Sequence, residues 1–99
     1  MKLSELEPRW IHPNLFIFRC PCCAKVWLTC KTIAMTRQET WDILKSGLGE
    51  DWNQIVVPPG PNSVWSVSGD FPDTISAHPS VDASASGHWH GFITNGQIV

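Results

Sequence analysis

Residues 15–31 read LFIFRCPCCAKVWLTCK and predict a β-hairpin whose turn is rich in cysteine. The apolar run Leu15–Phe18 is β-prone, and the side chains of Val26–Lys31 fall on two faces with the two-residue period of a strand. A tight turn over Pro21–Ala24 joins the two segments. In such a turn, backbone N–H groups can point at cysteine sulfurs and steady them as metal ligands. We therefore expect a hairpin of the zinc-knuckle type.

A second group of metal-ligand residues follows much later in the chain, in the tripeptide His88-Trp89-His90. Two thiols spaced C-x-x-C and two imidazoles spaced H-x-H match the tetrahedral ligand set of Zn²⁺. On an extended strand the two histidines lie about 6.5–7 Å apart on one face, and the flanking glycines permit the bend that brings both to one ion. We predict one Zn²⁺ held by Cys20, Cys23, His88 and His90.

The chain has two further cysteines, so the fourth ligand stays open between His88, Cys22 and Cys30. Cys22 adjoins Cys23 and is interpreted as a bystander or an alternate ligand. Cys30 is in phase with Leu28, which favours a buried small hydrophobe. A redox role for Cys20 and Cys23 is disfavoured, because a thioredoxin-like motif precedes a helix and here a strand follows.

The other elements are expected from capping, periodicity and turn signals. Thr36 and Glu39 form a capping box that begins a helix over residues 36–47, and Trp41, Leu44 and Leu48 give it one apolar stripe. Strands are expected over residues 64–68, 89–94 and 97–99, the last two joined by an Asn-Gly turn. Residues 58–62 (PPGPN) are expected to form an internal Pro-rich loop, and the small polar residues 76–87 a mobile loop.

These elements predict a mainly β (α+β) fold, with a small antiparallel sheet, a zinc-knuckle hairpin and one short helix. The 99 residues are expected to form one zinc-binding domain, residues 1–99, in which residues 1–13 are a lead segment. A loop-rich domain of this size commonly needs a metal or disulfide staple.

Composition disfavours several classes of partner. The net charge is −2 with no basic cluster, so nucleic-acid binding is not expected. No segment approaches the roughly 18 apolar residues of a membrane span, and the N-terminus does not resemble a signal peptide. We expect a cytoplasmic location, where reduced thiols favour metal over disulfide. A protein partner is expected, with Trp10, Trp52 and Trp89 as candidate anchors.

Catalysis is the alternative to binding. Ser80, together with His90 or His88 and with Asp70 or Asp82, supplies the residue types of a Ser-His-Asp arrangement. A zinc ion with only three protein ligands would instead leave a position for an activated water.

Five short motifs extend over most of the chain: FRCPCC at 18–23, WSVSGD at 65–70, TIS at 74–76, PSV at 79–81 and HGFITNGQI at 90–98. Together they resemble a small family of unknown function found mainly in tailed-phage and bacterial genomes. The resemblance implies a compact, zinc-containing, β-rich domain. Some relatives sit beside bacterial ubiquitin-like conjugation genes and resemble peptidases for the ubiquitin-like protein, which implies roles for Ser80 and His90.

The chain departs from that family next to the last motif. Many relatives have a cysteine just before, or three residues before, the position of His90, where this chain has Trp89 and Gly87. His88 is the substitute ligand. We therefore expect a zinc-stapled, phage-type accessory protein that acts by protein–protein binding, in the host cytoplasm. The alternative is a peptidase or hydrolase that processes a protein or ubiquitin-like tail, using Ser80 with His90 or a zinc-bound water.

Overall fold

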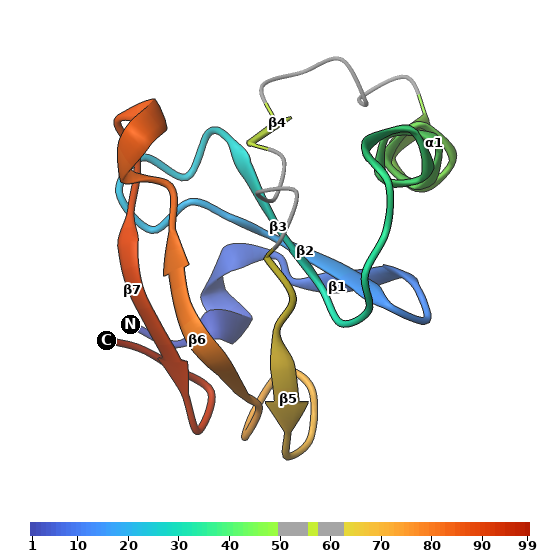
Figure 1. The fold of residues 1–99 in the computed structure, drawn as a ribbon. Helices are drawn as coiled ribbons and strands as arrows, with labels where there is room; N and C mark the ends of the chain where they lie inside the picture. The colour runs from blue at the N-terminus through green and yellow to red at the C-terminus, as the bar shows by residue number, and fades with distance from the viewer. Residues whose placement is uncertain (50–55, 58–62) are drawn as a thin grey trace.

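The computed structural model describes residues 1–49, 56–57 and 63–99, which form two four-stranded sheets and a helix (Figure 1). In the first sheet, three strands are antiparallel and the last joins in parallel. Its order is β1 (Arg9–His12), β2 (Leu15–Arg19), β3 (Trp27–Lys31) and β4 (Val56–Val57). The expected hairpin over residues 15–31 is confirmed as β2 and β3.

The second sheet is antiparallel throughout. Its order is β5 (Ser66–Ser68), β6 (Ser76–Asp82), β7 (His90–Thr94) and β8 (Gln97–Ile98). Asn95 and Gly96 both have positive φ, 50° and 73°, as the predicted hairpin turn between β7 and β8 requires. The mainly β fold class with one short helix is confirmed, with two small sheets where one was expected.

The loop expected over residues 76–87 is wrong. This stretch contains the longest described strand, β6, followed by a 3₁₀ turn, η3 (Ser84–Ser86). Ala77 and Val81 are buried, but Pro79 lies between them and the register with β7 shifts over the same residues. This irregularity and the small side chains hide the alternation that usually identifies a strand.

Helix α1 (Arg37–Leu48) begins and ends close to the expected bounds. The Glu39 N–H donates to the Thr36 hydroxyl at 3.1 Å, and the Thr36 N–H donates to the Glu39 carboxylate at 3.0 Å, which confirms the capping box. Leu44 and Leu48 pack on the face of the first sheet that carries Leu15, Ile17 and Trp27, forming a core between sheet and helix.

The opposite face of the first sheet packs against the second sheet. Phe16 and Phe18 of β2 are fully buried in this larger core, whose described members also come from β3, from the second sheet and from the N-terminal residues. β2 is therefore covered on both faces.

The segment expected as a lead, residues 1–13, carries β1 and a 3₁₀ turn, η1 (Leu3–Leu6), whose leucines enter the larger core. The two ends of the chain lie side by side, because the Leu3 N–H donates to the Gly96 carbonyl at 2.9 Å (Figure 1). The Pro-rich loop expected at 58–62 lies outside the described residues. Among those described, no helix is long and apolar enough to cross a bilayer.

Candidate metal centre

Three cysteines project from the turn that joins β2 to β3. The Cys20 N–H donates to the Val26 carbonyl at 2.9 Å, which closes the hairpin, and the Ala24 N–H donates back to the Cys20 carbonyl at 2.7 Å. Ala24 has a positive φ of 55°, so the backbone reverses directly after the cysteine motif. The turn therefore gathers the sulfurs of Cys20, Cys22 and Cys23 on one side.

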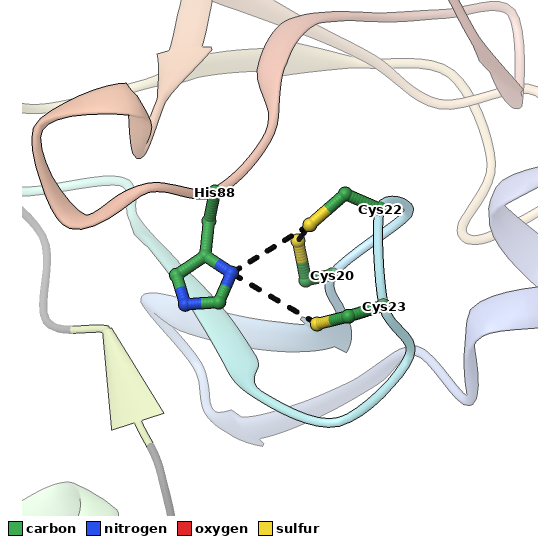
Figure 2. A group of neighbouring side chains, drawn as sticks. All are labelled: Cys20, Cys22, Cys23 and His88. Atoms are coloured by element: carbon green, nitrogen blue, oxygen red, sulfur yellow. Dashed lines mark hydrogen bonds between the residues drawn. The ribbon is translucent and has the colours of Figure 1, made fainter.

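A histidine from the second sheet approaches these sulfurs. Asp82, at the end of β6, accepts hydrogen bonds from the N–H and the hydroxyl of Ser84, which fixes the start of η3. Gly87 takes a left-handed conformation (φ 76°), and the His88 N–H donates to the Ala83 carbonyl at 3.0 Å. This short segment directs the His88 ring toward the cysteine turn (Figure 2).

The neighbouring residue anchors the same segment to the first sheet. The Trp89 ring packs edge-on against Phe18 of β2, with centroids 6.2 Å apart and an interplanar angle of 82°. Gly91 leaves room for this ring, because a Cβ at that position would lie 2.5 Å from a Trp89 ring carbon. His88 is thus positioned by packing as well as by backbone hydrogen bonds.

The four ligand atoms of Cys20, Cys22, Cys23 and His88 all lie within 4.8 Å of one another, close enough to hold a metal ion. The Cys20 and Cys22 sulfurs are 3.0 Å apart, and His88 Nδ1 is 3.6 Å from the Cys22 sulfur and 3.9 Å from the Cys23 sulfur (Figure 2). All four cysteines are free thiols.

The surroundings affect the thiols differently. Backbone N–H groups of Lys25 and Val26 donate to the Cys23 sulfur and lower its pKa from 9.0 to about 7, which favours the thiolate. A hydrogen bond with Cys20, and secondly removal from water, raise the pKa of Cys22 to about 11. Burial raises the pKa of the Cys30 thiol.

Three of the four predicted metal ligands, Cys20, Cys23 and His88, are brought together. The fourth member of the cluster is Cys22, which the sequence suggested only as a bystander or alternate. His90 is not in the group: it lies exposed on β7, and its predicted role as a ligand stays a prediction. Cys30 is fully buried in the larger core, as expected from its phase in the strand.

The residues considered for hydrolysis are also partly assembled. His90 Nε2 lies 3.4 Å from the Ser80 hydroxyl oxygen, across the β6–β7 pair. Asp82 is the cross-strand neighbour of His90, but its Oδ1 is engaged by Ser84. Within the described part of the chain, no carboxylate hydrogen-bonds to the His90 ring, so a serine–histidine pair is present without an orienting acid.

The candidate tryptophan anchors differ in exposure. Trp10 is 37% exposed, at the edge of a ring cluster with Phe16 and Phe71. Trp89 is half-buried, and Trp52 lies outside the described residues.

The cluster joins soft sulfur donors and one imidazole nitrogen in a partly buried site that connects the two sheets. Searches of protein-family models, curated proteins and solved structures find no match to this chain. Its function is therefore inferred from the chemistry of its own residues.

Proposed function

We propose that Cys20, Cys22, Cys23 and His88 bind one Zn²⁺ as a closed structural site. The main support for this proposal is that three sulfurs from the β2–β3 turn and a nitrogen from the segment before β7 lie within 4.8 Å of one another. Three thiolates and one imidazole form a common ligand set of structural zinc, and thiolates favour zinc over the harder cations.

The spacing of the donor atoms supports this proposal. With Zn–S bonds of about 2.3 Å and Zn–N bonds of about 2.0–2.1 Å, tetrahedral geometry places sulfur and nitrogen roughly 3.6 Å apart and two sulfurs roughly 3.8 Å apart. The sulfur–nitrogen distances of 3.6 and 3.9 Å are close to this value. The Cys20 and Cys22 sulfurs, 3.0 Å apart, must separate by roughly 0.8 Å to reach it, a small movement for exposed Cys22.

Such a site connects the sheets of a small domain. His88 lies 65 positions after Cys23 in the chain, and Cys20 belongs to the core between the sheets. Because the ligands converge only in the folded chain, the free energy of metal binding stabilises the fold. Four protein ligands fill the tetrahedral coordination and leave no position for a substrate, which favours a stabilising role over metal catalysis.

The role that we propose for the stapled domain is binding to a protein partner. The motif resemblance supports a phage-type accessory protein in the host cytoplasm, where thiols stay reduced. Exposed apolar side chains, Trp10 at 37% and Phe92 at 46%, are available for such contact.

Metal analysis of the purified protein tests the zinc site. We expect one zinc per chain, and after exchange for Co²⁺ the intensity of the sulfur-to-metal charge-transfer bands should correspond to three thiolates. Cys22→Ser should remove about a third of that intensity. The matched variant Cys30→Ala should keep it, because Cys30 lies in the core. Absence of bound metal, or full intensity in Cys22→Ser, would contradict the proposed ligand set.

A serine hydrolase is the second candidate function, and the 3.4 Å contact between Ser80 and His90 is the observation that favours it. A histidine in this position can accept the serine proton as the hydroxyl attacks a carbonyl. A fluorophosphonate probe, which labels activated serines, should then modify Ser80. Labelling should disappear in Ser80→Ala and persist in Ser68→Ala, an exposed serine on β5. Unlabelled wild-type protein would exclude this candidate.

A further inference from the structure

The three sulfurs of the candidate metal centre differ in their access to water. Cys20 is fully buried and Cys23 is half-buried, whereas Cys22 is exposed. Cys22 nevertheless belongs to the cluster, because its sulfur lies 3.6 Å from His88 Nδ1. Buried structural cysteines are inert, whereas accessible thiolates are the ones that oxidise. Of these three sulfurs, an oxidant dissolved in water therefore meets that of Cys22 first.

The buried sulfur of Cys20 lies directly beside the exposed one (Figure 2). The two sulfurs are 3.0 Å apart. This distance lies between the roughly 2.0 Å of a disulfide and the roughly 3.8 Å that separates two sulfurs around a tetrahedral zinc ion. A movement of roughly 1 Å in one direction completes the metal site, and a movement of similar size in the other direction brings the pair to bonding distance. The same turn can therefore serve both arrangements.

Cys23 is a less suitable partner, although it follows Cys22 directly in the chain. A disulfide between adjacent cysteines closes a small ring that contains their peptide bond, and such a ring strains the bond away from its planar trans form. With Pro21 between them, Cys20 and Cys22 close a larger ring. Cys30 is fully buried in the larger core, outside the cluster. Cys20 is therefore the expected partner of Cys22.

We propose, on the basis of the zinc site above, that Cys22 is an oxidation site at which a peroxide joins Cys20 and Cys22 in a disulfide. As zinc ligands both thiols are deprotonated, whatever the pKa of the free thiols. The Cys22 thiolate attacks hydrogen peroxide, the O–O bond breaks, and a sulfenic acid and hydroxide form. The Cys20 thiolate then attacks the Cys22 sulfur, forming the S–S bond and releasing a second hydroxide. The two sulfurs are oxidised and the peroxide is reduced.

Oxidation at this site removes two of the four proposed ligands and leaves only Cys23 and His88. Two ligands hold zinc far more weakly than a closed tetrahedral set, so the ion should be released. His88 then no longer connects the second sheet to the cysteine turn, and the fold loses the stability that metal binding supplies. In the cytoplasm, the location proposed above, disulfides are usually transient and either catalytic or redox-sensing. The site thus couples exposure to peroxide to a looser fold.

Treatment of the zinc-loaded protein with hydrogen peroxide tests the proposal. A chromogenic chelator that leaves the untreated protein loaded should record loss of the bound zinc, and dithiothreitol with added zinc should restore binding. Free thiols are then blocked with iodoacetamide in denaturant, before trypsin cleaves after Arg19 and Lys25. In the peptide over residues 20–25, only Cys23 should carry the label. Cys30, in the next peptide, should be labelled as well.

Two variants separate this site from general oxidation. Cys22→His replaces the exposed sulfur by another zinc ligand and should keep its zinc under a treatment that empties the wild type. Cys30→Ala, which changes a cysteine outside the cluster, should lose zinc at the wild-type rate.

The outcomes distinguish this site from the zinc site on which it rests. Zinc that stays bound to the treated wild type, label on Cys20 or Cys22, or equally fast zinc loss from Cys22→His would overturn the oxidation site alone. A protein that binds no zinc would overturn the zinc site and the oxidation site together. The wild-type labelling pattern decides the matter even if Cys22→His binds zinc weakly.

Discussion

Replacing His88 by alanine should remove the ligand that the second sheet gives to the proposed zinc site, while leaving three thiols together in their turn. In the unfolded chain those thiols can still bind zinc locally, but recruiting His88 closes a loop of 65 residues. For that length the closure entropy amounts to about 4 kcal/mol at 25 °C. The native fold already holds His88 in place, so its bond to zinc favours the native state by up to this amount. We expect His88→Ala to lower the free energy of unfolding by a large part of about 4 kcal/mol, against a typical total of about 5–15 kcal/mol.

Urea unfolding at a fixed excess of free zinc measures this loss, and His90→Ala is the control. His90 is an exposed histidine two positions away, so its replacement should change stability by no more than about 0.5 kcal/mol. In zinc-free buffer with a chelator, His88→Ala and the wild type should converge. A loss below about 1 kcal/mol for His88→Ala would refute the reasoning, because it would then resemble an ordinary surface substitution. An equal loss in His90→Ala would indicate that His90 is a ligand as well.

Three further outcomes follow from the packing around the site and from the helix cap. Gly91→Ala places a Cβ against the Val99 carbonyl oxygen and 2.5 Å from the Trp89 ring. We therefore expect a cost of about 1–3 kcal/mol in thermal or urea unfolding, together with weaker zinc binding in a chelator competition. Thr36→Ala removes the side-chain acceptor of the α1 capping box and should cost about 1 kcal/mol in urea unfolding; an unchanged midpoint would show that the cap contributes nothing. A hydrogen bond from the Thr36 backbone N–H holds the pKa of Glu39 below its usual value. The ionised carboxylate therefore stabilises the fold at pH values above the unfolded-state pKa. This contribution is lost as the pH falls through the folded-state pKa. Below about pH 5, the free energy of unfolding in urea should therefore fall less steeply with decreasing pH for Glu39→Gln than for the wild type. Equal slopes for the two proteins would contradict this role.

The elements with strong local signals were predictable from the sequence. Leu15–Phe18 and Val26–Lys31 carry the strand signature, and Thr36 with Glu39 identifies the helix start. In each case the residue types of one short segment carry the signal. Strand β6 was missed because Pro79 and a register shift interrupt the alternation between Ala77 and Val81. Its pairing with β5 and β7 is what makes it a strand.

The candidate metal centre shows the same limit. The C-x-x-C spacing and a distant histidine were sufficient to predict that Cys20, Cys23 and His88 lie together. The inclusion of Cys22 depends on the conformation of the whole turn. This turn contains a positive φ at Ala24, which is uncommon for a residue with a side chain and cannot be read from residue type. His90 was grouped with His88 on the rule of strand alternation. That rule does not apply, because β7 begins at His90 and leaves His88 in the preceding segment.

The burial of β2 on both faces has a consequence for how the molecule opens. Its odd-numbered apolar side chains support the helix layer and its even-numbered ones support the opposing sheet, so neither layer can separate without exposing the same strand. Local fluctuations should therefore be confined to the periphery, and the backbone amides of Phe16 and Ile17 should exchange with deuterium only through global denaturation. The two cores should therefore unfold as one cooperative unit, because β2 contributes side chains to both.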